Sequence, residues 1–429
     1  MLKKVASAVV ILSYVAWNLL AWNFSEPVDS YDTIRYFQPL SDTLNPGIVV
    51  NSIYLTLNSG TLITFAQVAI ATTAWVLLAL AILVRLRWTP VAWFMTIIVL
   101  LFSLTNPIWS WHMLTYTESL TNSALVLWFA SIVWLTARPS SALKALIPFS
   151  IAAILVALTR PQLLVFVLPT QLVILVWWWR KNGRPIPVVG SLLSIAPFMA
   201  FAVYRVQQVT EIDVYRMRYA LHNLVGKNSS FRDYALAEMP PCDLVSQALN
   251  GPSPWNDTQA LESTMISPCP DTWMWFRSDA VNLQNWVPAR FSQAIVEFGT
   301  QMQGLILSIG TQSSALPSFL STTLLNPSYP LIWALAYLIA GIGLAIAAGA
   351  KPKVSVLSVL GVGVVVSTVL LQMFFVWGAD GESVERHQYP VIPMILIALL
   401  VFPSVWPAQR RDASPQNSME FALPATLAG

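Results

Sequence analysis

Long apolar runs alternate with shorter polar connections along most of this chain of 429 residues. Each run is close to the roughly 20 residues that a helix needs to cross a bilayer, and tilt or local thinning accommodates the shorter ones. The pattern predicts about ten membrane-spanning helices: Val5–Asn23, Leu62–Val84, Val91–Pro107, Leu120–Ala137, Ala145–Thr159, Leu163–Trp179, Val188–Tyr204, Pro330–Ala350, Val354–Trp377 and Val391–Trp406. We therefore predict an all-α polytopic membrane protein with both ends on the same side.

The composition agrees with this class. Hydrophobic residues make up 56% of the chain and charged residues only 10%, whereas about a quarter of the residues in a soluble domain are charged. The first apolar run is long and lacks a persuasive small-residue cleavage site, so we interpret it as a retained helix and not as a signal peptide. No basic run or Gly-rich phosphate loop indicates binding of nucleic acid or nucleotides.

The charges predict the orientation of the chain. Acidic residues are scarce in the expected inner segments, where only Asp412 and Glu420 occur. Every expected inner segment contains basic residues: Lys3, Lys4, Arg85, Arg87, Arg138, Lys144, Arg180, Lys181, Arg184, Lys351, Lys353, Arg410 and Arg411. This positive-inside bias puts both termini in the cytoplasm. We expect a bacterial plasma membrane, with the polar chemistry on its periplasmic or extracellular face.

One long polar stretch, residues 205–329, separates the seventh and eighth spans, and we expect it to form a small folded domain on the outer face. It contains Cys242 and Cys269. The oxidising outer compartment favours a disulfide between them, with two unpaired thiols as the alternative. The domain plan is a transmembrane core (1–204) with its first outer loop (24–61), the large loop (205–329), C-terminal helices (330–407) and a disordered cytoplasmic tail (408–429).

Three carboxylates crowd the first outer loop: Glu26, Asp29 and Asp32. Arg35 and Tyr36 follow Asp32 by three and four residues, which puts all three on one side of a short interfacial helix. A carboxylate beside an arginine stays ionised and positioned, as a general base for an acceptor hydroxyl must be. The alternatives are an interfacial helix with one internal ion pair, and metal binding by the three carboxylates.

Charged residues also stand at the outer ends of later spans. Glu118, which follows His112 closely, opens the fourth span and either caps the helix dipole or lies beside an active site. Arg160 ends the fifth span and either snorkels or pairs with a lipid phosphate or a first-loop carboxylate. Arg386 and His387 precede the last span and suit an anionic head group, unless Arg386 pairs within its own loop. The aromatic residues before Glu118 are expected to be interface anchors: Trp109, Trp111 and Tyr116.

The order of these motifs resembles the GT-C superfamily of glycosyltransferases that use polyprenyl-phosphate sugars. The resemblance covers the membrane core, about 1–204 and 330–406, and not the large loop. The first-loop motif is similar to the Asp-Glu-X-Arg-Tyr element of the aminoarabinose and protein-mannosyl branch, although Thr33 replaces its acidic second residue. The motifs that carry the resemblance are Asp32-Thr-Ile-Arg35-Tyr36, Thr117-Glu118-Ser119, Arg160-Pro161 and Arg386-His387.

The resemblance implies an inverting sugar transfer from a polyprenyl phosphate to an acceptor hydroxyl on a glycan, glycolipid or protein. Asp32, or Asp29 as its competitor, would be the base, and Arg160, Arg386 and His387 would hold the departing lipid phosphate. The supporting residues would be Glu26, Arg35, Tyr36, Glu118 and His112. No cofactor is required and no metal ligand is assigned, although a divalent cation stays open. Tryptophans of the large loop would either stack on sugar rings or form its core: Trp255, Trp273, Trp275 and Trp286.

Two other functions are the alternatives. An oligosaccharide polymerase or ligase would take a lipid diphosphate donor and would not need a first-loop carboxylate. A transporter of lipid-linked glycans would carry polar or Gly/Pro-broken positions in the middle of paired spans, which are scarce here. The sequence identifies neither the sugar nor the acceptor.

Overall fold

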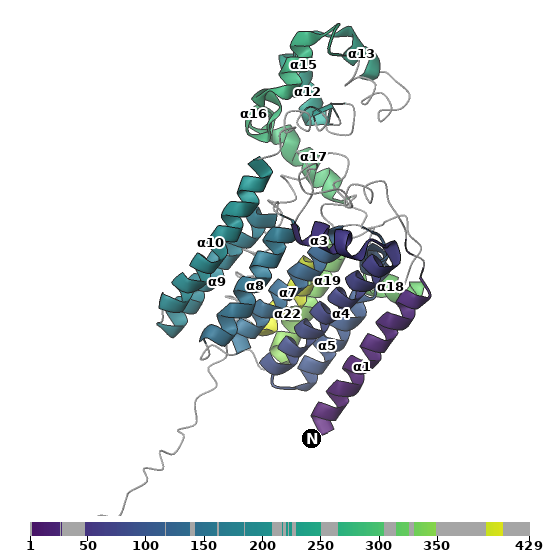
Figure 1. Ribbon diagram of the computed structural model, residues 1–429, viewed down its shortest axis with the longest axis vertical. Helices are drawn as coiled ribbons and strands as arrows, with labels where there is room; N and C mark the ends of the chain where they lie inside the picture. Colours follow the sequence, from purple (N-terminus) through teal and green to yellow (C-terminus); the bar gives the residue numbers. More distant parts are fainter. Residues whose placement is uncertain are drawn as a thin grey trace, which may run out of the picture.

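The computed structural model describes residues 2–25, 27, 48–115, 117–137, 142–160, 163–183, 185–207, 217, 220–221, 223–224, 229–249, 265–303, 315–325, 330–348 and 392–405. These residues form helices and turns, with no β-strand among them. A bundle of long helices carries a group of short helices at one end (Figure 1). The predicted all-α class is therefore confirmed for this part of the chain.

Helices occupy the position of every expected span except Val354–Trp377, which lies outside the described residues. They are α1 (Leu2–Asn23), α4 (Gly60–Arg85), α5 (Pro90–Ser103) with α6 (Asn106–His112), α7 (Thr117–Ala137), α8 (Ala142–Thr159), α9 (Leu164–Asn182), α10 (Pro185–Gln207), α19 (Pro330–Ala347) and α22 (Ile392–Val405). Within the described ranges, three helices are long and apolar enough to cross a membrane, in α1, α4 and α7; the α5–α6 pair, bent by 55°, makes a fourth if it is one span. This content indicates a membrane protein.

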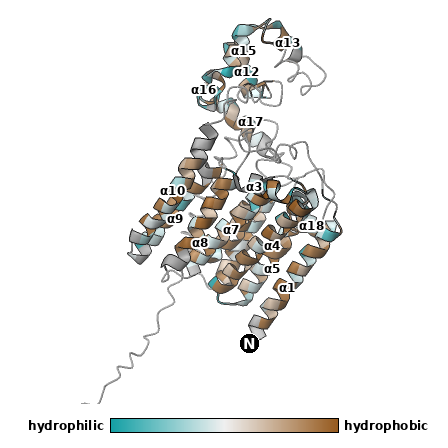
Figure 2. Ribbon diagram, in the orientation of Figure 1, coloured by the Kyte–Doolittle hydropathy of each residue, from teal (hydrophilic) through white to brown (hydrophobic). Residues whose placement is uncertain are grey.

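The centre of the bundle is formed by α4, α7 and α8. Helix α4 packs along α7, α7 packs against α8, and α10 covers α8, while α22 lies against α19 and touches α7. The interior is filled by large apolar side chains such as Trp75 and Phe149, which are almost completely buried. Apolar side chains also face outward, as Leu12 of α1 does with 67% exposure. Figure 2 shows the hydrophobic colouring along the bundle helices, which is the surface that a bilayer would cover.

Contacts between distant segments identify the two ends of the bundle. The Nε of Arg85, at the end of α4, donates to the carbonyl of Val405, at the end of α22, over 3.1 Å. At the other end, the indole of Trp22 in α1 donates to the hydroxyl of Thr64 near the start of α4, over 3.3 Å. The start of α4 and the end of α1 therefore lie together, opposite the end of α22.

Helices α19 and α22 approach each other closely at Gly341. A Cβ at this position would lie 2.3 Å from the carbonyl oxygen of Leu399 and 2.8 Å from that of Leu400. Small residues permit such backbone approaches between helices in membranes. Gly341 therefore fixes the spacing of this helix pair.

The group of short helices has a hydrophobic core of its own. Its helices are α12 (Ser229–Glu238), α13 (Asp243–Leu249), α15 (Pro270–Arg277), α16 (Leu283–Ala289) and α17 (Phe291–Gln303). Phe231, Phe276 and Trp286 are fully buried among them. Trp286 is therefore a core residue and not a platform for a sugar ring, and the guanidinium of Arg277 lies over the Trp273 ring, 4.4 Å from its centroid.

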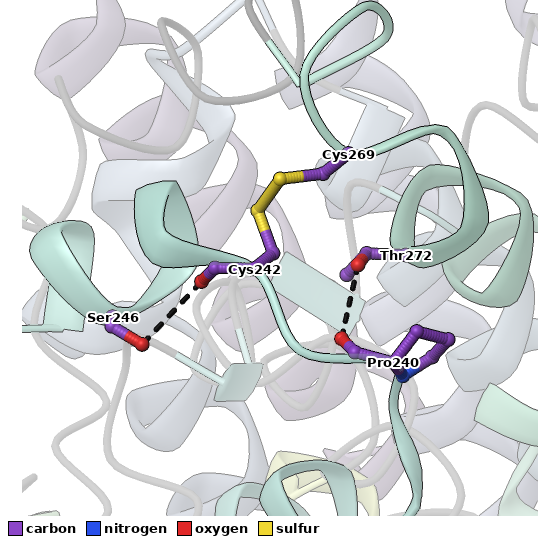
Figure 3. The surroundings of a disulfide bond; sticks show 5 residues. All are labelled: Pro240, Cys242, Ser246, Cys269 and Thr272. Atoms are coloured by element: carbon purple, nitrogen blue, oxygen red, sulfur yellow. Dashed lines mark hydrogen bonds between the residues drawn. A yellow bond between two sulfur atoms is a disulfide. The ribbon is translucent and has the colours of Figure 1, made fainter.

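A disulfide joins Cys242 to Cys269, as the sequence predicts, with 5.8 Å between the Cα atoms. Figure 3 shows the bond between the segments that lead into α13 and α15. Beside it, the hydroxyl of Thr272 donates to the carbonyl of Pro240 over 3.0 Å. The bond ties these two helices together across a sequence separation of 27 residues.

Candidate functional site

A buried ion pair joins the fourth and fifth expected spans. Glu118 lies in the first turn of α7, and Arg160 directly follows the last residue of α8. The Nη1 of Arg160 donates to the Oε1 of Glu118 over 3.3 Å, and only 6% and 0% of the two side chains are exposed. Each of these buried charges would destabilise the protein if its partner were absent, because it would then be uncompensated.

The backbone holds Arg160 in place. Its N–H continues the last turn of α8 by donating to the carbonyl of Val156 over 2.9 Å, and its own carbonyl accepts from Leu163 over 3.0 Å. The sequence left three partners or fates open for this arginine, and the partner that the structure describes is Glu118. Glu118 is therefore more than a cap of the helix dipole.

His112 belongs to the same cluster through Ser119. The Nδ1 of His112, the last residue of α6, and the hydroxyl of Ser119, the residue after Glu118, are 2.7 Å apart. Both side chains are buried, with 2% and 0% exposed. The ring of Trp109 meets the His112 ring in a T-shaped arrangement with 6.1 Å between the centroids. Ser119 belongs to the Thr117-Glu118-Ser119 motif, but the sequence alone assigns it no role. The only sequence signal for this contact is a serine in the first turn of a helix, shortly after a histidine.

Several polar side chains near the cluster in sequence are also buried. Thr115, Thr121 and Asn122 are fully buried, as are Ser123 and Thr105. Buried polar groups are conspicuous because each needs a hydrogen-bond partner away from water. The start of α7 is thus a region where buried polar side chains are concentrated.

Helix α3 (Ile48–Leu57) borders this region, and the sequence did not predict it. It packs against α8 and α4, and its Val50 and Tyr54 form a small buried cluster with Ile63 and Leu120. The hydroxyl of Tyr54 accepts a hydrogen bond from the amide of Gln67 over 2.9 Å. The end of the first loop is therefore fixed beside the first turn of α7.

Two tryptophans differ from the expectation. Trp109 and Trp111 were expected to anchor at the membrane interface, but they are 0% and 4% exposed and lie inside the protein. The reason is the bend between α5 and α6, which turns α6 into the bundle, where it contacts α4 and α7. Trp109 thereby lies against His112 of the polar cluster.

Most of the other predicted site residues lie outside the described residues: Glu26, Asp29, Asp32, Arg35, Tyr36, Arg386 and His387. The structure therefore brings together Glu118, Arg160 and His112 and leaves the predicted base untested. Within the described ranges, no group of three His, Cys, Asp or Glu side chains could hold a metal ion.

The cluster combines groups that suit an anionic ligand. A guanidinium presents five N–H donors in a planar fork, a geometry that matches carboxylates and phosphates. A carboxylate that holds it in position reduces the reorganisation needed when a ligand arrives.

Comparison of the chain with models of protein families, with curated proteins and with solved structures found no match.

Proposed function

We propose that this protein is an inverting glycosyltransferase that moves a sugar from a polyprenyl phosphate to an acceptor hydroxyl on the outer face of a bacterial plasma membrane. The proposal includes the finer topology: ten spans, both termini in the cytoplasm, and the short helices forming an outer-face domain. The acceptor is a cell-surface glycan, glycolipid or protein.

The observation that carries the proposal is the buried pair of Glu118 and Arg160, with 3.3 Å between Oε1 and Nη1. It lies at the same end of the helices as the expected acidic first loop, because α1 ends and α4 begins there. A guanidinium held in a fixed position is the kind of group that stabilises the charge on a departing lipid phosphate. Its overall charge is balanced, so the donor phosphate needs further cations, which Arg386 and His387 would supply.

In the proposed reaction the acceptor oxygen attacks the anomeric carbon while Asp32, or Asp29, takes its proton. The bond between the anomeric carbon and the phosphate oxygen breaks with inversion, and polyprenyl phosphate departs with the electron pair. Arg160, Arg386 and His387 stabilise the charge that develops on that phosphate. No cofactor is required for this chemistry, and dependence on a divalent cation is decided by assay with chelator.

The test is sugar transfer by the purified protein from a panel of short-chain polyprenyl-phosphate and polyprenyl-diphosphate sugars. We expect turnover with a monophosphate donor, and its loss in either the Asp29→Asn or the Asp32→Asn variant while donor binding is retained. Turnover from diphosphate donors alone, with both aspartate variants equal to the parent, would replace the proposal by the ligase. Movement of an intact lipid-linked glycan without transfer would replace it by the transporter.

A further inference from the structure

The hydrogen bond between His112 and Ser119 crosses the turn that joins α6 to α7. It links the last residue of one helix to the first turn of the next, with 2.7 Å between Nδ1 and Oγ. The Oγ of Ser123 donates to the carbonyl of Ser119 over 2.9 Å, one turn further into α7. Ser119 is therefore attached both to α6 and to the body of its own helix.

Helix α6 is itself held firmly, so the bond has a fixed end. Every residue from Pro107 to His112 is buried. The N–H of Asn106, which begins the helix, donates to the hydroxyl of Ser321 in α18 (Ser318–Leu324) over 2.8 Å. The Trp109 ring meets the His112 ring at 88° between the planes, which restricts rotation of the imidazole. The imidazole can thus act as a strut between α6 and α7.

The hydrogen bond between His112 and Ser119 also fixes the position of Glu118, the residue before Ser119. Glu118 meets Arg160 over 3.3 Å, which is beyond the usual 2.7–2.9 Å of a charge-assisted hydrogen bond. A further shift of the first turn of α7 by about half an ångström would leave the two groups outside good hydrogen-bond geometry. The hydrogen bond between Glu118 and the Arg160 guanidinium therefore depends on the position of this turn.

We propose that His112 is a positioning residue: through Ser119 it sets the first turn of α7, and so it sets where Glu118 holds the Arg160 guanidinium for the donor phosphate. This inference rests on the proposed function. It gives His112 a role through its Nδ1 and assigns it no proton transfer with the substrate.

Two substitutions separate the ring nitrogens. Asparagine places an amide atom near the position of Nδ1, whereas glutamine places its amide near the position of Nε2. An asparagine amide can either donate to the Ser119 hydroxyl or accept from it, so the test does not depend on the tautomer of His112. The variants are His112→Asn, His112→Gln and Ser119→Ala, with Ser150→Ala as the control, because Ser150 bonds to Ser191 over 2.7 Å between α8 and α10, away from the cluster.

The measurements are kcat and KM for the polyprenyl-phosphate donor, the Kd for polyprenyl phosphate alone, and the melting temperature. We expect His112→Gln and Ser119→Ala to raise KM and Kd about tenfold, and His112→Asn to recover most of that loss. The pH profile of kcat should be the same in His112→Asn and in the parent. The control variant should alter neither constant.

Three results would overturn the inference. Equal loss in the asparagine and glutamine variants would show that Nδ1 is not the atom that matters. A changed pH profile of kcat in His112→Asn would make His112 a proton carrier. Lower melting temperatures with unchanged KM and Kd would make the bond merely structural. If the parent transfers no sugar but binds polyprenyl phosphate, the proposed function fails while the ranking of Kd values still decides this inference.

Discussion

Neutralising both members of the buried ion pair should destabilise the protein by clearly less than the sum of the two single neutralisations. Glutamine is isosteric with glutamate and is shorter than arginine, so Glu118→Gln changes charge alone, whereas Arg160→Gln and the double variant also remove some buried side-chain volume. In each single variant the remaining ionised group stays buried without the opposite charge that its partner supplied. In the double variant neither charge remains to be compensated.

The magnitude follows from the geometry. Unit charges 3.3 Å apart attract each other by about 5 kcal/mol at an effective dielectric constant of about 20. Removing one partner of a buried pair typically costs about 3–5 kcal/mol, because it leaves an uncompensated charge. We therefore expect each single variant to lose about 3–5 kcal/mol of unfolding free energy, and the double variant to lose at least about 2 kcal/mol less than the sum of the two.

The assay is reversible unfolding in mixed micelles, followed by far-ultraviolet circular dichroism. Arg277→Gln is the matched control, since it removes the same type of charge from a guanidinium that lies over the Trp273 ring, outside the long-helix bundle. It should cost about 0.5–1 kcal/mol. The reasoning is refuted if either single variant behaves like this control, or if the losses in the double variant simply add.

Three further predictions concern the rest of the fold. Gly341→Ala should cost about 1–3 kcal/mol by forcing α19 away from α22, whereas Gly343→Ala, with open space around it, should be neutral or stabilising; thermal unfolding of both variants measures the difference. Replacing Cys242 and Cys269 by serine should cost roughly 3–4 kcal/mol for a loop of 27 residues, seen as faster proteolysis of the short helices, and reductant should have the same effect on the parent. Glu297→Gln should cost about 1 kcal/mol, because its carboxylate accepts from the first backbone N–H groups of α12. If the short helices of this variant unfold with the same free energy as those of the parent, the capping role is contradicted.

Much of the fold could be predicted because length and hydropathy are enough to identify a membrane-spanning helix. The bend between α5, which ends at Ser103, and α6, which begins at Asn106, could not be predicted in the same way. It depends on tertiary contacts: Asn106 bonds to α18, and α6 packs against α4. Helix α3 was missed for a related reason: its ten residues are too few to span a bilayer, and its place depends on the cluster around Tyr54.

The candidate site was predictable in its residue types but not in its pairing. An arginine at the end of an apolar run signals a partner, but sequence separation does not say which carboxylate is near. Glu118 and Arg160 meet because α7 and α8 run antiparallel, which brings the start of one to the end of the other. The burial of Trp109 could not be foreseen either, since an interfacial and an inward-facing tryptophan look the same in sequence.

The most direct test of the central claim is to locate the lipid phosphate in the protein. A polyprenyl phosphate with a photoreactive group beside its phosphate would be crosslinked to the protein in nanodiscs, and the labelled peptides identified by mass spectrometry. The account predicts labelling at the start of α7 and the end of α8, suppressed by unlabelled polyprenyl phosphate but not by the uncharged polyprenol, and lost in Arg160→Gln. Labelling elsewhere, or equal suppression by the polyprenol, would contradict it.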